Sequence, residues 1–366
     1  MRGHPVRPIV IAAGGTGGHF FPAEALAAEL IQRGHRVALM TDARSGALKS
    51  EVFAGREVFT LRGAGLAGRG LRAVTGALSL LAGTVQARGI LNRLDAAAVV
   101  GFGGYPSVAP VMATRFLRRR PAVVLHEQNA VLGRANRMLS RYADRLALGL
   151  PIQAVAPHHV LVGNPVRPAI HALSGQGYVP PQPDGPIHLL VVGGSLGARV
   201  FSDVVPGIVA RLPDALRQRV RVVQQCRAED VARVQDAYAN AGIAAELSTF
   251  FPDMAARLRD AHFVIARAGA GTVAELCVAG RPALLVPLPG AIDGHQAVNA
   301  ASVDALVLDQ AEFEHTPAVL AEALAQRLAC PDMMAVMAHA IAAHGRPDAA
   351  SALADLVEQL AQKVPA

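Results

Sequence analysis

The hydrophobic positions of this chain form short continuous runs, which alternate with longer segments that have the spacing of amphipathic helices. Runs rich in Val, Ile, Leu and Ala are typical of strands buried on both faces of a sheet. The runs occupy residues 8–12, 36–41, 97–101, 122–126, 145–148, 187–192, 221–225, 262–266, 283–287 and 305–308. Because helical segments separate them, the pattern predicts parallel sheets covered by helices on both faces.

The runs divide into two sets of about five strands, which predicts an α/β protein with two doubly wound parallel-sheet domains. The joint is predicted at residues 162–168, where two prolines and a glycine interrupt the pattern. The predicted domains are residues 1–165, joined by a C-terminal helix at 347–366, and residues 166–346. Two such domains are expected to face each other across a deep cleft at the carboxyl ends of their strands.

A glycine-rich loop follows the first predicted strand and leads into a helix, whose spacing is seen at residues 23–30. Residues 14–18 contain four glycines, and His19 comes directly after the last of them. A strand, a glycine loop and a helix start direct backbone N–H groups and the positive helix end at an anion, usually a phosphate. The pattern therefore predicts an anion site with an ionisable ring beside it. The alternative is a tight turn followed by a solvated histidine.

Further glycine-rich or polar segments follow other predicted strands, at residues 101–107, 126–129, 193–199, 267–275 and 288–299. Residues 126–129 are four consecutive hydrogen-bonding side chains, which are costly to bury without partners. A helix N-cap at Asn129 would explain one of them, and a polar ligand would explain several. Near residue 270 the small side chains suit a diphosphate, and Glu275 could accept hydrogen bonds from a ribose diol. The alternative for Glu275 is a glutamate that stabilises the helix dipole.

One segment also fits the fingerprint of nicotinamide-dinucleotide sites. Residues 269–274 match G-x-G-x-x-G/A, and Asp293 lies near the expected acidic position. The first glycine loop fails the same test, because Phe20 stands where a small residue is required. The matching segment also lies late in its predicted domain. An NAD-dependent oxidoreductase is therefore an alternative that the first loop disfavours.

Composition indicates a globular protein, since 52% of the 366 residues are hydrophobic and 17% are charged. Charged residues or glycines interrupt the apolar stretches before they reach the ~20 residues that span a bilayer. The N-terminus leads into a strand without the apolar region of a signal peptide. Three widely spaced cysteines suit a reducing compartment and suggest neither a disulfide framework nor a zinc site. We expect a cytoplasmic protein, either soluble or attached to a membrane from that side.

Charge is distributed unevenly between the two predicted domains. Residues 1–165 hold 20 Lys and Arg against 8 Asp and Glu, whereas residues 166–366 hold 15 against 20. This asymmetry suggests that the first half faces a polyanion. Tryptophan is absent and aromatic residues make up 4%, so the stacking platforms of single-strand nucleic-acid binders are scarce. An anionic membrane leaflet is the favoured partner, and nucleic acid is not expected.

The basic residues of the first half accompany an apolar stripe. Residues 58–94 contain five arginines and no acidic residue, and residues 115–120 hold four more arginines. The stripe recurs at helical spacing and consists of Leu71, Val74, Leu78, Leu81 and Val85. Apolar residues bordered by arginines fit peripheral attachment to an anionic leaflet. The alternative is that the stripe packs inward as a core face.

Taken in order along the chain, six motifs resemble those of the bacterial N-acetylglucosaminyltransferases of glycosyltransferase family 28, which act in peptidoglycan synthesis. They lie at residues 14–19, 103–105, 126–129, 163–167, 193–198 and 267–275. The resemblance implies a GT-B fold and inverting transfer of N-acetylglucosamine from UDP-GlcNAc to the MurNAc C4 hydroxyl of undecaprenyl-diphospho-MurNAc-pentapeptide (lipid I). The product would be lipid II, with no metal or other cofactor. It also implies peripheral attachment to the cytoplasmic face of the inner membrane.

The resemblance also implies roles for individual residues. The acceptor hydroxyl needs a base near neutral pH, and a neutral histidine suits that task, so we expect His19 to be the catalytic base, with Glu127 assisting or orienting it. The substrate-binding residues would be Thr16, Gly17, Gly18, Tyr105, Asn129 and Arg167 in the first half, and Ser195, Phe251, Ala270, Gly271, Thr272, Val273, Ala274, Glu275 and Gln296 in the second. The backbone near Phe251 would meet the uracil edge, and Gln296 the sugar hydroxyls.

Two positions depart from the family pattern: Leu196 replaces a common glutamine, and Gly290 stands where many relatives have a histidine. Leu196 suggests only a modest adjustment of the site. Gly290 makes residues 290–296 the segment whose alignment with the family is least secure. A GT-B transferase with another lipid acceptor stays an alternative. So does a UDP-sugar-binding protein without turnover, although His19 at the anion loop argues against it.

Overall fold

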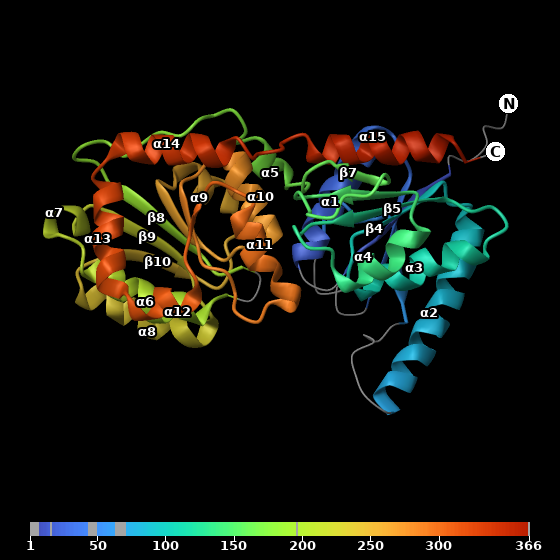
Figure 1. The fold of residues 1–366 in the computed structure, drawn as a ribbon, viewed down its shortest axis with the longest axis horizontal. Coiled ribbons are helices and arrows are strands. Elements are labelled where there is room, and N and C mark those ends of the chain that lie inside the picture. Colours follow the sequence, from blue (N-terminus) through green and yellow to red (C-terminus); the bar gives the residue numbers. More distant parts are fainter. Residues whose placement is uncertain (1–6, 15–16, 43–49, 63–70, 195–196, 365–366) are drawn as a thin grey trace. The chain divides into compact units, whose positions relative to one another are not determined.

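The structure is a computed structural model that describes residues 7–14, 17–42, 50–62, 71–194 and 197–364 (Figure 1). The chain forms two compact units, one of Met1–Arg167 together with Pro347–Ala366, and one of Pro168–Arg346. Each unit is built around a parallel β-sheet with helices on both faces. The predicted fold class, two doubly wound α/β domains, is confirmed.

The sheet of the first unit has seven parallel strands in the order β3-β2-β1-β4-β5-β6-β7. Their bounds are β1 Ile9–Ala12, β2 Val37–Asp42, β3 Glu57–Leu61, β4 Ala98–Gly101, β5 Ala122–Glu127, β6 Arg145–Leu148 and β7 His159–Leu161. The strand order reverses between β1 and β4. In open parallel sheets a ligand binds at the carboxyl ends of the strands beside such a switch point.

Helices cover both faces of this sheet, and the residues of β1 alternate between them. Ile9 and Ile11 pack against α1 and α15, whereas Val10 belongs to the opposite core with residues of α2, α3 and α4. The helices are α1 Gly17–Gln32, α2 Leu71–Leu94, α3 Val108–Ala113, α4 Arg134–Leu139 and α15 Ala349–Gln362. None of the helices in the described part of the chain is long and apolar enough to cross a bilayer.

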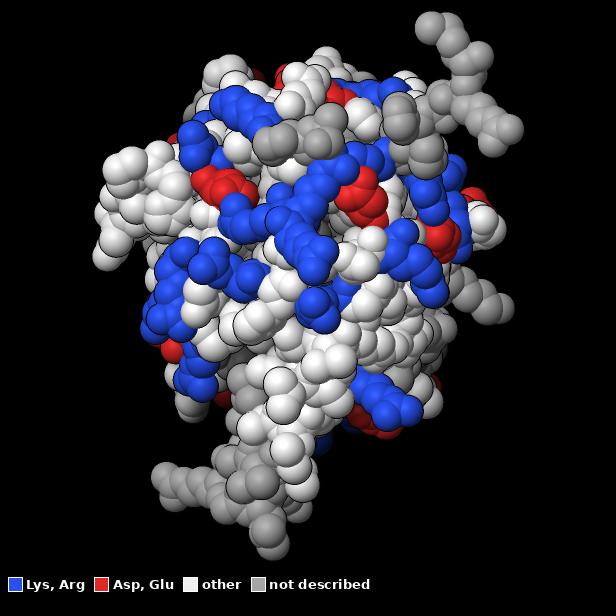
Figure 2. All heavy atoms as spheres, turned by 90° about the vertical axis from the view of Figure 1, so that its right-hand side faces the viewer, with Lys and Arg blue, Asp and Glu red and all other residues white. Residues whose placement is uncertain are grey.

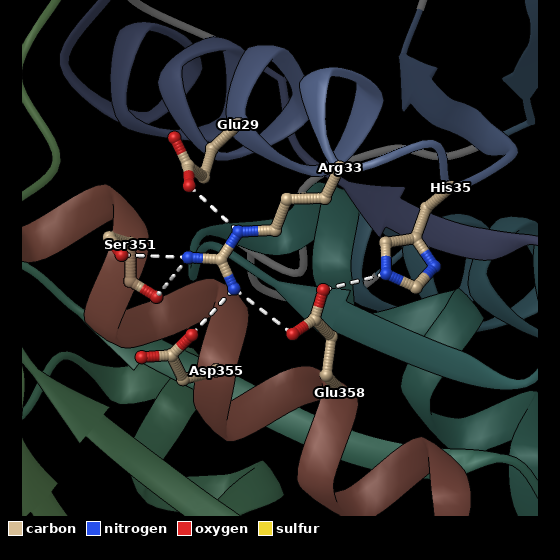
Figure 3. Close-up of polar contacts among 6 residues, drawn as sticks. All are labelled: Glu29, Arg33, His35, Ser351, Asp355 and Glu358. Carbon is tan, nitrogen blue, oxygen red and sulfur yellow. Dashed lines mark hydrogen bonds and ion pairs between the residues drawn. The ribbon is translucent and has the colours of Figure 1, made fainter.

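The C-terminal helix α15 returns to the first unit and is held there by Arg33, the residue directly after α1 (Figure 3). The Arg33 guanidinium donates to Asp355, Glu358 and the Ser351 hydroxyl at 2.5, 3.0 and 2.7 Å. It also bonds Glu29, one helical turn earlier in α1, at 2.8 Å. The hydrogen bond to Asp355, followed by these other carboxylates, raises the Arg33 pKa. The network fixes α15 to the helix that carries His19.

The sheet of the second unit has six parallel strands in the order β10-β9-β8-β11-β12-β13. Their bounds are β8 Ile187–Val192, β9 Val220–Gln225, β10 Ala244–Ser248, β11 Phe263–Ala266, β12 Ala283–Leu285 and β13 Leu306–Val307. The helices are α5 Pro168–His171, α6 Arg199–Ala210, α7 Asp214–Arg217, α8 Val231–Asn240, α9 Met254–Asp260, α10 Ala270–Ala279, α11 His295–Ala301, α12 Gln310–His315, α13 Pro317–Leu328 and α14 Pro331–Ala342. The order reverses between β8 and β11, which places the switch point beside α6 and α10.

Three strands were not predicted from the hydrophobic pattern: β3, β7 and β10. Each lies at the edge of its sheet. In β3, for example, half-buried and exposed residues alternate from Glu57 to Thr60. Such strands lack the continuous apolar run that identifies a strand buried on both faces.

Helix α1 also starts earlier than the pattern suggested. Gly17, Gly18 and His19 lie within its first turn, so the His19 ring projects from a helix end at the carboxyl edge of the sheet.

Candidate functional site

His19 lies beside the loop that follows β4, at the switch point of the first sheet. Its ring nitrogen Nδ1 is 2.9 Å from the carbonyl oxygen of Phe102 and 3.2 Å from the side-chain amide of Gln128. The Phe102 carbonyl oxygen can only accept, so this shorter contact requires the proton on Nδ1 when the ring is neutral. An amide nitrogen cannot donate to a protonated Nδ1, so the Gln128 contact is a hydrogen bond only with the amide turned to present its oxygen. The other nitrogen, Nε2, is then unprotonated, as a general base requires.

Two glycines let the loop after β4 lie against the His19 ring. Gly103 and Gly104 have φ angles of 77° and 64°, which favour residues without a Cβ atom. A Cβ atom on Gly104 would lie 3.8 Å from Nε2 and Cδ2 of His19, and one on Gly103 would lie 3.2 Å from the Asn136 side chain. These glycines therefore set the close approach of the loop to the reactive face of the ring.

Glu127 is buried at the end of β5 and is occupied by its own loop. One carboxylate oxygen accepts from the backbone and side-chain nitrogens of Asn129, at 3.1 and 3.2 Å. The other accepts from the Gly133 N–H and the Asn136 side chain, both at 2.9 Å. Four donors on one buried carboxylate indicate that Glu127 fixes the shape of residues 127–136. Helix α4 is capped at its N-terminus by Gly133, so the predicted N-cap at Asn129 is wrong.

His126 is fully buried beneath this loop. Its Nε2 donates to the Gly163 carbonyl oxygen at 3.0 Å, and its ring packs against Phe102. Burial lowers the pKa of His126 from 6.5 to about 4, so the ring is neutral at physiological pH. His126 joins the β5 loop to the segment that carries Asn164 and Arg167.

The buried histidine predicts a loss of stability in mild acid. Between the unfolded pKa of 6.5 and the folded pKa of about 4, the unfolded chain binds a proton that the folded chain does not. Stability from this group is complete above pH 6.5 and falls as the pH decreases toward 4, by up to about 3 kcal/mol. Urea unfolding at pH 7, 5.5 and 4.5 measures this loss of stability. His126→Gln should lose less stability over this range than the natural protein, and an equal loss in both would contradict the assignment.

The other predicted residues of the first unit lie close to this edge. The Tyr105 hydroxyl donates to the Asp42 carboxylate at the end of β2. Arg167 stacks on the Phe21 ring of α1, with its guanidinium carbon 5.2 Å from the ring centre. Gly17 and Gly18 begin α1, and Thr16 lies outside the described residues.

In the second unit a glycine loop follows β8 at the switch point. A Cβ atom on Gly193 would lie 2.3 Å from the Ala198 nitrogen, so only glycine fits there. Gln225, at the end of β9, accepts from the Gly193 N–H and donates to the Thr249 carbonyl oxygen, both at 3.2 Å. One side chain therefore links the glycine loop to the segment that follows β10. The predicted residue Ser195 lies outside the described residues.

Helix α10 begins at Ala270 after Gly269, and its N-terminus is open. A Cβ atom on Gly271 would meet nothing within 4 Å. The first N–H groups of a helix have no partner within it and are directed along its positive end. Glu275 is half-buried one turn further along the helix. The predicted segment Ala270–Glu275 therefore forms an accessible helix start at the carboxyl edge of the sheet.

Phe251, between β10 and α9, is only 4% exposed. Among the described residues no protein group hydrogen-bonds its amide, and its carbonyl group opens the turn formed by Pro252 and Asp253. Its neighbour Phe250 differs, because the Ser248 hydroxyl bonds both the amide and the carbonyl oxygen of that residue. The Phe251 amide can therefore donate to a ligand, and its carbonyl oxygen has a second lone pair that can accept from one.

The remaining predicted residue, Gln296, closes the loop that follows β12. Its side-chain oxygen accepts from the Leu288 N–H at 2.9 Å. The loop between them contains positive φ angles at Gly290, Asp293 and Gly294. Within the described part of the chain, no three His, Cys, Asp or Glu side chains come together as metal ligands.

Sequence reasoning missed the residues that organise the two sites, namely Asn136, Gln225 and Arg267. Arg267 is buried and donates to the carbonyl oxygens of Val286 and Pro287 and to Gln310. Each of the three acts through partners that are distant in sequence or lie in loops. The one available signal was a polar residue inside an otherwise apolar segment, such as Gln225 at the end of a predicted strand.

Known proteins resemble this chain along its whole length. The profile of the glycosyltransferase family 28 N-terminal domain matches residues 9–148, and that of the C-terminal domain matches residues 188–353. A Granulibacter bethesdensis protein is 57% identical over 96% of this chain and 94% of its own length, and one from Acidiphilium cryptum is 53% identical over 98% of both. Both are named UDP-N-acetylglucosamine--N-acetylmuramyl-(pentapeptide) pyrophosphoryl-undecaprenol N-acetylglucosamine transferase.

Solved structures show the same fold. The crystal structure of Acinetobacter baumannii MurG superposes with a TM-score of 0.77 and 29% identity, over 96% of this chain and 99% of that one. The calicheamicin glycosyltransferase CalG4 superposes with a TM-score of 0.66 at 20% identity, over the full length of both chains, and supports the fold alone.

Proposed function

The chain belongs to glycosyltransferase family 28, and we propose that it transfers N-acetylglucosamine from UDP-GlcNAc to the MurNAc C4 hydroxyl of lipid I, giving lipid II. The observation that carries the proposal is that relatives sharing half or more of its residues over nearly the whole chain bear the name of this activity. The two sheet edges described above supply groups suited to each substrate.

The second unit is the proposed donor domain. Its open α10 N-terminus suits a diphosphate, because the first N–H groups of a helix have no partner within it, and the glycine loop after β8 lies at the same edge of the sheet. Glu275 lies where a carboxylate could accept hydrogen bonds from a ribose diol, and Gln296 is assigned to the sugar hydroxyls. Ser195, in the glycine loop, is assigned to the diphosphate.

The backbone of Phe251 is proposed to recognise the uracil base by hydrogen bonding. Uracil offers an N3–H donor and an O4 acceptor, which match one carbonyl oxygen and one N–H group. Cytosine reverses this pattern, since N3 accepts and the exocyclic amine donates. The N–H of Phe251 has no other partner among the described residues and its C=O can accept a second hydrogen bond, so both groups support selection of uracil.

The first unit is the proposed acceptor domain, with Thr16, Gly17, Gly18, Tyr105, Asn129 and Arg167 lining the substrate. His19 is the proposed base for the acceptor hydroxyl, since the contact with Phe102 leaves Nε2 unprotonated in the neutral ring. Glu127 acts by orientation, because its oxygens are occupied by four donors of its own loop. As the anomeric bond breaks, negative charge grows on UDP, and N–H groups at the helix ends stabilise it.

Transfer of radiolabelled GlcNAc from UDP-GlcNAc to a lipid I analogue, with EDTA present, tests this proposal. Labelled lipid II is expected, and its formation would establish the donor, the acceptor class and independence of divalent metal together. Binding of UDP-GlcNAc without product would leave the donor site intact and overturn the acceptor. Binding of NADH in place of UDP would favour the oxidoreductase instead.

An anionic inner leaflet is the proposed partner of the first unit, with peripheral attachment to the cytoplasmic face of the membrane. In α2, Leu78, Leu81 and Val85 are 61%, 62% and 63% exposed, so these stripe residues do not pack into a core. Phe116 is also exposed, and its carbonyl oxygen accepts from Arg88 of α2. Figure 2 shows basic side chains in blue gathered on this side of the first unit, with acidic ones sparse among them. Apolar residues next to arginines suit a membrane surface.

Charge reversal at Arg115 and Arg118 should weaken binding to anionic vesicles by at least about 30-fold, since each basic residue near such a surface contributes about 1 kcal/mol. Both side chains are exposed, whereas Arg119 and Arg120 pair with Asp95 and Asp144 at 2.9 Å and are left intact. Vesicle sedimentation at low salt measures the effect.

The matched control is the double variant Arg211→Glu and Arg221→Glu in the second unit, which changes the net charge equally at exposed positions. It should bind anionic vesicles nearly as well as the natural protein. Equal losses in the two double variants would show that only net charge matters and would reject this surface.

A further inference from the structure

The side chain of Arg257, in α9, makes three contacts that converge around Phe251. Its two terminal nitrogens bond the two carboxylate oxygens of Glu246 in β10, at 2.5 and 2.6 Å. Its Nε donates to Asp253, immediately before α9, at 2.9 Å. Its guanidinium carbon lies 5.2 Å from the centre of the Phe251 ring. Arg257 therefore joins the strand before the Phe251 segment to the helix after it and covers the ring between them.

This geometry restricts the orientation of Phe251 more than a single ion pair would. A guanidinium bonded to both oxygens of a carboxylate is held in one plane, and here the same group lies over the aromatic ring. The stacking is favourable in itself, because a cation is attracted to the face of the ring. Since the ring is fixed, rotation of the Phe251 backbone is opposed as well.

The residues on either side of Phe251 are anchored separately. Gln225 holds the carbonyl of Thr249, and the Ser248 hydroxyl holds both polar backbone groups of Phe250. Apart from the turn that its C=O opens, Phe251 has no backbone hydrogen bond to the described residues, so the orientation of its N–H and C=O depends largely on the packing of its side chain. Arg257 supplies a charged and directional part of that packing.

We propose that Arg257 is a positioning residue for donor recognition, which holds the Phe251 backbone in the orientation that reads uracil. The inference rests on the proposed function, in which Phe251 meets the base, and extends it to a residue that touches neither substrate nor reacting atoms. Base selectivity then depends on the contacts of Arg257 with Glu246, Asp253 and the Phe251 ring.

Arg257→Ala should raise the Kd for UDP by about five- to tenfold, in keeping with the loss of a cation–π contact and a bidentate ion pair. It should lower the preference for UDP over CDP by a similar factor, because a mobile backbone no longer distinguishes the two bases. The turnover number at saturating UDP-GlcNAc should be unchanged, so the effect falls on KM. Arg257→Lys keeps the positive charge but lacks the planar guanidinium. Its Kd for UDP and its preference for UDP over CDP should lie between those of the natural protein and those of Arg257→Ala.

Arg259→Ala is the matched control. Arg259 lies two residues further along α9 and bonds Asp260 at 2.8 Å, far from the Phe251 ring by the geometry of the helix. It should leave both UDP affinity and base preference unchanged. Glu246→Gln is a milder second variant, because this carboxylate is exposed. It should weaken UDP binding and lower the preference for UDP over CDP, as Arg257→Ala does, but by less.

Calorimetric titration with UDP and CDP separates the possible failures. If the natural protein does not prefer UDP to CDP, the assignment of the donor site fails and this inference fails with it. If it does, but Arg257→Ala keeps the preference, Arg257 has only a structural role and the inference is wrong, even where the melting temperature falls. A reduced preference in Arg257→Ala with an unchanged Arg259→Ala supports it.

Discussion

Replacement of His19 by alanine is expected to lower kcat about 10³-fold, within the range that general-base catalysis contributes. The expectation follows from the tautomer: Nδ1 donates to the Phe102 carbonyl oxygen, so Nε2 is the nitrogen able to accept the proton of the acceptor hydroxyl. The Kd for UDP should not change, because UDP is assigned to the other unit. Turnover is measured by transfer of labelled GlcNAc to a lipid I analogue, and binding by calorimetry.

His35→Ala is the control for His19→Ala. His35 lies in the same unit and bonds Glu358 of α15 at 2.7 Å, so its loss should affect stability and leave turnover nearly unchanged. Added imidazole should partly restore turnover to His19→Ala by occupying the space of the missing ring. Near-normal turnover of His19→Ala, with normal donor binding, would remove His19 from the role of base.

The sequence located the loops that carry the candidate residues, but it missed some of the elements around them. His19, Glu127 and the glycine loops were found because glycines and polar residues interrupt apolar runs at the ends of buried strands. The edge strands β3, β7 and β10 were missed because one side of each is solvated and the apolar run is broken. The start of α1 was placed too late because glycine is a poor helix former, yet Gly17 and Gly18 occupy its first turn.

The supporting residues could not be predicted, since their partners are brought together only by the fold. Gln225 and Thr249 are 24 residues apart, and Asn136 reaches back to the carboxylate of Glu127. For the apolar stripe on α2, the sequence predicted the residues but could not predict whether they are buried. Helical spacing described it correctly, but only the structure distinguishes a face packed into a core from one exposed to solvent at Leu78 and Leu81.

Glu127→Gln should show whether Glu127 orients the loop beside His19 or is itself the catalytic base. The amide nitrogen of the glutamine would face two donors in place of an acceptor, whichever oxygen it replaced, because each carboxylate oxygen already accepts two hydrogen bonds. We expect unfolding stability to fall by about 2–4 kcal/mol. We expect kcat to fall by about 10- to 100-fold, because Gln128 and Asn129 move with the loop beside His19.

The pH dependence of kcat then decides between orientation and base catalysis. If Glu127 orients the loop, the basic group whose titration affects kcat is His19. The kcat of Glu127→Gln is then lower at every pH but depends on pH in the same way. If Glu127 is the base, that titration disappears. Asp144→Asn is the matched control, because Asp144 also accepts a backbone N–H, that of Val123 at 2.7 Å, but at the opposite end of β5. It should lower stability without lowering kcat, since a carboxylate at the amino end of the strand stabilises the sheet without supporting the loop beside His19.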